Sequence, residues 1–221
     1  MKKHCVTPGC HETTAGYSTL CDLHKQVQRR HGHATQQGVT VHALKPYGAR
    51  VAARRAKNKD SNAWSLLAQR WGIVVEHSRK TLAEYATGKA DFRHSVQAAE
   101  QVRNLADSVP AEAIVQTALA MYLYRDDQPR RFKSDRAFDF QLVRRVRGLS
   151  TLNAGSYWDG KSSRNRRVYR DLPPRTAVTL AEALKEAFGL AGVMLAGKER
   201  QEAALAKQDH QRLAKALDAL A

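Results

Sequence analysis

The chain has 221 residues and carries 37 Lys and Arg against 21 Asp and Glu, a formal net charge of +16. Hydrophobic residues make up 43% of the chain, which allows a packed core and argues against wholesale disorder. The sequence contains no run of 18 apolar residues and no apolar secretory leader. We therefore expect a soluble, cytoplasmic protein that has no membrane span and binds a polyanion, most commonly nucleic acid.

The excess positive charge is confined to two segments. Residues 1–60 carry 11 basic and 3 acidic side chains, and residues 125–170 carry 13 and 5, whereas residues 61–124 and 171–221 are neutral. Charge that served only solubility would be spread evenly, so the pattern predicts two polyanion-contacting surfaces or two parts of one such surface. The alternative is an Arg-rich face that is merely solvated.

All three cysteines lie near the N-terminus. Cys5, Cys10, Cys21 and His24 form the pattern C-x4-C-x10-C-x2-H, in which two close ligand pairs are separated by a loop. This spacing predicts a four-ligand zinc site with no open position for water, which indicates a structural role. The odd cysteine count and the missing leader argue against disulfides. His4 and His11 are competing ligands of poorer geometry, since each adjoins a cysteine.

This N-terminal segment resembles the short zinc-binding heads of small phage and mobile-element proteins, some of which are HNH-type nucleases. The resemblance covers about 25 of the 221 residues. It implies a Cys3His zinc site and a nucleic-acid context. No HNH catalytic pattern follows downstream, so we carry no nuclease activity over and expect no enzyme.

The predicted fold is mainly α, with a small zinc module, a helical body and one β-hairpin. One interpretation of the helix and hairpin is a winged-helix-like arrangement. We divide the chain into five parts in order. These are a zinc-binding module (1–30), a linker and basic helix (31–60), a helical core (61–124), a basic helix plus hairpin (125–172) and C-terminal helices (173–221).

The first basic helix is expected over residues 45–59, where alanines favour helix. Arg50 and Arg54 share a face by their spacing, and Arg55 adds charge beside them. Such a helix can lie along phosphates, or it can be an ordinary basic surface helix. Neutral helices are then expected over residues 61–86, with Ser61 as N-cap, and over 91–109 and 111–124.

The second basic segment predicts a helix over 135–148, capped by Ser134, and a hairpin around a Gly/Ser/Asn loop near residue 160. In the winged-helix interpretation, the helix enters the major groove and the hairpin contacts phosphates. The residues expected to contact nucleic acid here are Arg130, Arg131, Arg144, Arg145, Arg147, Lys161, Arg164, Arg166 and Arg167.

Pro173-Pro174 marks a boundary before the C-terminal part. A helix is expected from Thr176 or Thr179 to Phe188, and the glycines at 189, 192 and 197 are expected to weaken its continuation. The Ala-, Lys-, Gln- and Leu-rich residues 198–221 either pack on the body or pair with a second copy of the chain, giving a homodimer.

The favoured function is a DNA-binding regulatory or accessory protein of a mobile element or bacterial genome, stabilised by structural zinc and acting in transcription regulation at the nucleoid. One alternative is an RNA-binding protein of a ribonucleoprotein, in which Tyr157, Trp158 and Tyr169 stack bases. Further alternatives are a protein-docking subunit of a nucleic-acid machine and a nuclease. The nuclease would use the local acid cluster formed by Asp126, Asp127, Asp135 and Asp139.

Overall fold

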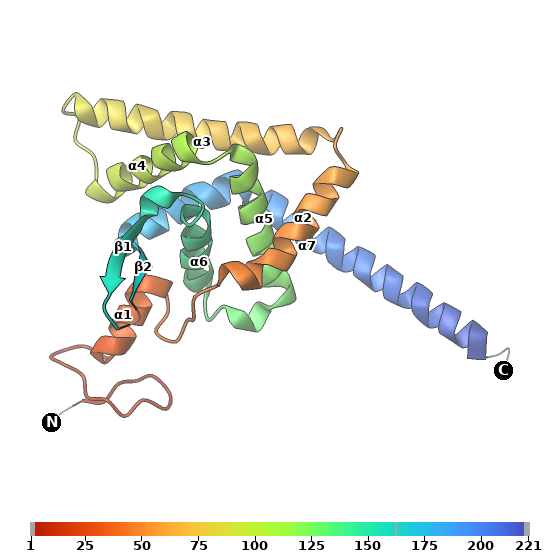
Figure 1. The fold of residues 1–221 in the computed structure, drawn as a ribbon, viewed down its shortest axis with the longest axis horizontal. Helices are drawn as coiled ribbons and strands as arrows, with labels where there is room; N and C mark the ends of the chain where they lie inside the picture. The colour runs from red at the N-terminus through yellow and green to blue at the C-terminus, as the bar shows by residue number, and fades with distance from the viewer. Residues whose placement is uncertain (1–2, 162, 219–221) are drawn as a thin grey trace.

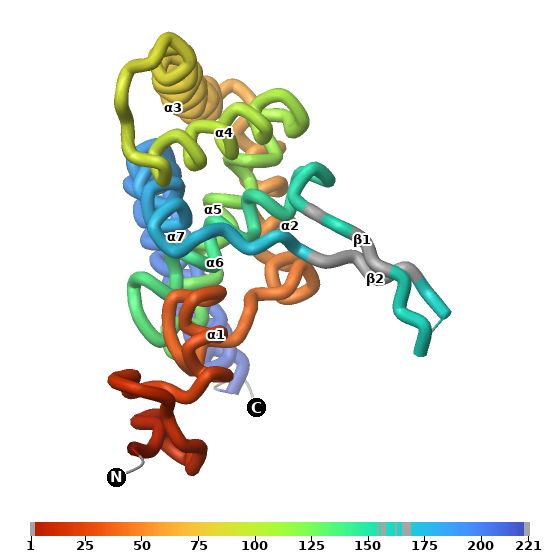
Figure 2. The backbone as a smooth tube through the Cα atoms, turned by 90° about the vertical axis from the view of Figure 1, so that its left-hand side faces the viewer, coloured from red at the N-terminus to blue at the C-terminus, as the bar shows by residue number. Residues whose placement is uncertain are grey.

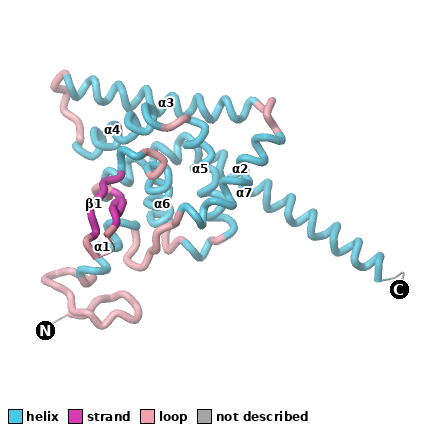
Figure 3. The backbone as a smooth tube through the Cα atoms, in the orientation of Figure 1, coloured by secondary structure: helices cyan, strands magenta, loops and turns pink. Residues whose placement is uncertain are grey.

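The computed structural model describes residues 3–161 and 163–218, without the side chains of residues 154, 156, 157 and 165–168. The described chain is mainly helical (Figures 1 and 3). None of its helices combines the length and apolar character that crossing a membrane requires. In chain order the elements are α1 (Asp22–His31), α2 (Val41–Lys57), α3 (Asn62–Ala86), α4 (Arg93–Ser108), α5 (Ala111–Asp127), the 3-10 turn η1 (Pro129–Arg131), α6 (Asp135–Arg147), the 3-10 turn η2 (Thr151–Asn153), β1 (Ala154–Asp159), β2 (Arg164–Tyr169) and α7 (Pro174–Asp218).

The core is built around α5, whose residues from Ile114 to Tyr124 are buried except for the partly exposed Gln116 and Thr117. A helix that is apolar on all sides belongs in a protein interior. Helix α5 contacts α2, α6 and α7, while α3 and α4 pack on each other at the edge of the body. Trp71 of α3 stacks on Phe188 of α7 with ring centroids 6.2 Å apart, which ties that outer layer to the core.

Serine caps start two of the helices where the sequence predicts them. The Ser61 hydroxyl accepts a hydrogen bond from the Ala63 amide (3.4 Å), and the Ser134 hydroxyl accepts one from the Ala137 amide (3.1 Å). Each cap satisfies an amide that the first helical turn leaves unpaired. The boundaries of α3 and α6 are therefore confirmed to within a residue.

The predicted weakening of the C-terminal helix at its glycines is wrong. Helix α7 runs without a break from Pro174 to Asp218. A Cβ atom at Gly192 would lie 2.3 Å from the Tyr122 ring, and one at Gly189 would lie 3.2 Å from the Tyr122 hydroxyl. These glycines let α5 and α7 approach closely around one tyrosine, and this contact offsets their low helix propensity.

Strands β1 and β2 pair antiparallel, from Ala154 opposite Tyr169 to Asp159 opposite Arg164. Figure 2 shows this two-stranded ribbon projecting away from the helical body. The expected winged-helix arrangement does not fit the helix that precedes the ribbon. Most of α6 is buried, including Phe138, Leu142 and Val146 at 0% exposure, so α6 has no free face with which to enter a DNA groove.

The residues between α1 and α2 lie against α6. The buried side-chain oxygen of Gln141 accepts a hydrogen bond from the Val39 amide (2.8 Å), and its amide nitrogen donates one to His31 Nδ1 (3.1 Å). Gly32, with φ +83°, sits so close that a Cβ atom there would lie 2.6 Å from the Arg136 carbonyl oxygen. The segment from His31 to Val39 is therefore anchored on α6.

Candidate metal centre and basic surfaces

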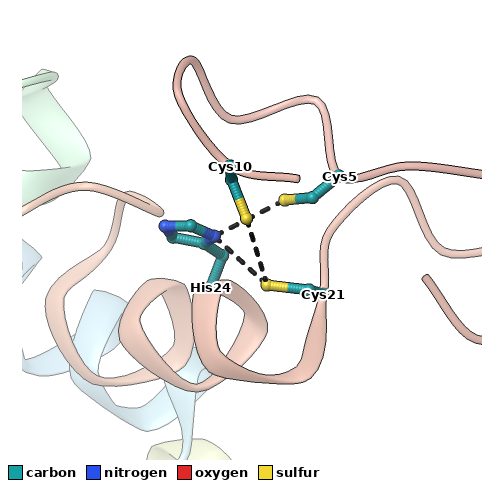
Figure 4. A group of neighbouring side chains, drawn as sticks. All are labelled: Cys5, Cys10, Cys21 and His24. Carbon is teal, nitrogen blue, oxygen red and sulfur yellow. Dashed lines mark hydrogen bonds between the residues drawn. The ribbon is translucent and has the colours of Figure 1, made fainter. Parts of the chain in front are cut away.

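Cys5, Cys10, Cys21 and His24 lie together, with one ligand atom from each within 4.8 Å of the others (Figure 4). Cys10 Sγ is 3.9 Å from Cys21 Sγ, and His24 Nδ1 is 3.2 Å from Cys21 Sγ and 3.5 Å from Cys5 Sγ. Zn–S bonds of about 2.3 Å in a tetrahedron place sulfurs about 3.8 Å apart and sulfur and nitrogen about 3.6 Å apart. The four side chains can therefore hold a metal ion.

Two local structures position these ligands. Residues 7–10 form a tight turn in which the Cys10 amide donates to the Thr7 carbonyl (3.0 Å), with Pro8 second and Gly9 third at φ +77°. This is the residue order that a type II turn requires. Cys21 is the N-cap of α1, and His24 follows in its first turn. Pro, Gly and the helix start thus bring the two ligand pairs together.

The environment of Cys5 favours its thiolate. Burial opposes ionisation, but hydrogen bonds from the Thr7 hydroxyl, from the Cys21 and Thr7 amides and from His24 outweigh it and lower the Cys5 pKa to about 6. Thr7 is itself buried, and its hydroxyl lies 3.4 Å from Cys5 Sγ. The sequence prediction missed Thr7, although its place two residues after a cysteine was the available signal.

The alternative ligands His4 and His11 lie outside this group among the described residues. His4 Nδ1 lies instead 3.2 Å from the His11 carbonyl oxygen. The set of close ligand atoms is the one that the cysteine spacing predicts, Cys5, Cys10, Cys21 and His24.

The arginines of α2 face acidic side chains from other elements. Arg50 Nη1 lies 2.5 Å from Asp127 and its Nη2 lies 2.5 Å from Glu199 of α7. Arg54 pairs with Glu202 of α7, and Arg55 pairs with Glu112 of α5. The neutral segments therefore supply Glu112, Glu199 and Glu202 to this basic helix, and Asp127 comes from the second basic segment.

The three arginines at the end of α6 are partly or fully buried. Arg147 is only 3% exposed, which corrects its expected contact with bases. Arg144 pairs with Asp171, an acid that also lies 3.0 Å from Arg30 of α1. Arg145 is half-buried, and burial followed by the nearby Arg144 lowers its pKa.

The remaining predicted contacts divide into structural and exposed residues. Arg131 donates to the Gln37 side chain (2.8 Å) and to the Gly38 carbonyl (3.4 Å), so it holds the segment before α2. Arg130, Lys161 and Arg164 are exposed. The side chains of Arg166 and Arg167 lie outside the described residues.

The four acidic residues considered for a nuclease site each pair with a basic side chain. Asp127 meets Arg50, and Asp135 lies 2.5 Å from Arg125. The two other partners are Lys185, 2.8 Å from Asp139, and Arg200, 3.2 Å from Asp126. Each carboxylate thus serves an ion pair, and no two of them are held together by a common partner in the described chain.

The fold and site together define a helical protein with a candidate Cys3His metal centre at its N-terminus. No family model matches the chain, and neither a curated protein nor a solved structure is detectably similar to it.

Proposed function

We propose that the protein is a DNA-binding accessory protein whose N-terminal centre holds structural zinc. The zinc assignment rests on ligand chemistry, since three thiolates and one imidazole in a tetrahedral spacing suit Zn²⁺. All four positions belong to the protein, so the ion would fold the segment without activating water.

One observation carries the nucleic-acid proposal. The β1–β2 ribbon projects from the body (Figure 2). Lys161 and Arg164 at its tip are exposed, whereas Arg54 and Arg55 of α2 are engaged in ion pairs. Its base is held firmly, because Arg147 donates to Tyr169 and Asn153 on either side of the ribbon. A projecting basic arm that is anchored at its base can follow a phosphate backbone.

The experiment compares the two predicted basic surfaces by salt titration of duplex binding. The ribbon variant is Lys161→Gln/Arg164→Gln, and the matched variant on α2 is Arg54→Gln/Arg55→Gln, which removes the same charge. The ribbon variant should flatten the slope of log K against log salt by about 2, since each lost phosphate contact removes about 1. An unchanged slope for the ribbon variant would contradict the proposal. A flatter slope in the α2 variant alone would assign the DNA-contacting surface to α2.

Single-stranded RNA is a second candidate because Trp158 is 62% exposed on β1. An exposed indole beside cations can stack on an unpaired base, worth about 1–3 kcal/mol. Trp158→Ala should then weaken single-stranded RNA binding and leave duplex DNA binding unchanged. An equal effect on both substrates, or no effect, would remove this candidate.

A further inference from the structure

A cleft of about 570 Å³ opens between the start of α2, the middle of α5 and the end of α6. Lys45 and Arg145 are its charged lining residues, and no Asp or Glu lines it. By contrast, Arg50 of α2 and Arg144 of α6 pair with the carboxylates of Asp127 and Asp171. The cleft therefore carries positive charge that the fold itself leaves uncompensated.

Arg145 is the unusual member of this lining. Its Nε atom is buried and has no hydrogen-bond partner in the described chain. A buried guanidinium N–H without an acceptor is destabilising, and proteins rarely keep one without a use for it. The lowered Arg145 pKa agrees with this picture, since burial and the adjacent Arg144 both disfavour its charge.

The rest of the cleft is apolar with a few polar groups. Leu44 and Ala120 are buried, and Leu149 is 38% exposed at the cleft. Gln116 donates to the Gly48 carbonyl (2.9 Å), which fixes the wall between α5 and α2. Pre-formed clefts of about 300–1,000 Å³ with apolar walls and few polar groups are typical of small-molecule sites.

We propose that this cleft binds a small organic anion, in which a carboxylate or phosphate monoester is attached to a short apolar body. The anionic group would accept hydrogen bonds from Arg145 and Lys45, and the apolar body would lie against Leu44, Ala120 and Leu149. A nucleic-acid backbone fits less well, because a phosphodiester chain makes no use of the apolar walls. The proposal does not depend on DNA binding.

The test is calorimetric titration of the full chain with hexanoate and with hexyl phosphate, using 1-hexanol as the neutral match. Saturable binding of at least one anion and none of hexanol is expected. Arg145→Met should weaken anion binding at least tenfold. It should leave the ligand-free melting temperature equal or higher, because the buried Nε–H without a partner is gone. If Arg145 served only to stabilise the fold, the substitution would lower the melting temperature.

Two further variants keep the result decisive. Lys45→Met changes an exposed side chain and should weaken anion binding several-fold even if Arg145→Met fails to fold. Arg103→Met removes the same charge at an exposed position on α4 and should bind like the wild type. Absence of anion binding, equal binding of hexanol, or wild-type affinity in Lys45→Met would overturn the proposal. The wild type could fail to bind either anion while Arg145→Met loses duplex binding. That result would overturn the proposal and show that the cleft contacts the phosphates of DNA.

Discussion

Arg147 was expected to read bases, yet its contacts make it the anchor of the β1–β2 ribbon. Its Nε donates to Gln101 (2.8 Å), its Nη1 donates to the Tyr169 hydroxyl and the Arg170 carbonyl (both 2.9 Å), and its Nη2 donates to Asn153 (3.0 Å). These bonds join α4 and α6 to the base of the ribbon, where β1 starts and β2 ends. Burial lowers the Arg147 pKa, although Tyr169 opposes that effect.

Replacing Arg147 with Met should lower the free energy of unfolding by about 2–4 kcal/mol, because it leaves several buried acceptors unpaired. Urea denaturation followed by circular dichroism measures this loss. The exposed Arg103→Met serves as control and should change stability by less than about 0.5 kcal/mol. If both variants lose the same amount, Arg147 does not anchor the ribbon.

The environment of His31 predicts that the folded protein loses stability in acid. Partial burial lowers its pKa, with Arg144 and Arg30 acting in the same direction and Asp171 opposing them. The unfolded chain, with a His pKa of about 6.5, therefore binds a proton that the folded chain resists, so stability falls as the pH drops below about 6.5.

The variant His31→Gln keeps a polar group beside Gln141 but cannot titrate. Between pH 7.5 and 5.5 it should lose less stability than the wild type, with both proteins held at the same zinc concentration. Denaturation midpoints across this range give the comparison, and parallel curves for the two proteins would rule out His31 as the titrating group.

At the scale of elements, α1 depends on its two ends. It has ten residues and no buried side chain, and helices this short are marginal in water. Cys21 and His24 hold its start, while Arg30 and His31 tie its end to Asp171 and Gln141. The Cys/His cluster at its start and docking on α6 at its end therefore supply the order that its sequence lacks.

The purified protein should contain one zinc ion per chain by elemental analysis. Removing the ion with a chelator, or substituting Cys10→Ser, should increase amide exchange over residues 3–31 while α5 and α6 stay protected, because the core makes no use of the metal. Thr14→Ser is a mild control in the same loop. Exchange that rises equally in α5 would show that the metal supports the whole fold.

The helical elements themselves follow from local patterns. Apolar spacing and the Ser61 and Ser134 caps locate α3 and α6 in the sequence, because these signals act within a few residues. The continuity of α7 could not be predicted, since Gly189 and Gly192 are explained by Tyr122, about 70 residues earlier.

For the whole molecule, the last part of α7 stands apart. Ion pairs from Arg50 and Arg54 to Glu199 and Glu202 hold α7 near α2. Beyond these pairs every residue from 203 to 218 is exposed, and Figure 1 shows this end of α7 extending away from the body. A segment without tertiary contacts adds little to the stability of the body.

A chain ending at Lys207 should therefore melt within about 2 °C of the full-length protein at low protein concentration. A chain ending at Leu195 is the contrasting variant, since it loses Glu199 and Glu202 and should melt at a clearly lower temperature. The contrary result is a chain ending at Lys207 that melts below the full-length protein, by a difference that grows with protein concentration. That result would show that residues 208–221 pair with a second copy.

The sequence alone predicted the candidate metal ligands and most helices, because cysteine spacing, caps and apolar periodicity are properties of short stretches. Only the tertiary structure decided what the arginines do. Arg50 is neutralised by acids 77 and 149 residues away, Arg147 is buried beneath Tyr169, and Lys161 stays exposed on the ribbon. Charge acts through space, so a basic residue's partner is fixed by packing and not by its neighbours in the chain.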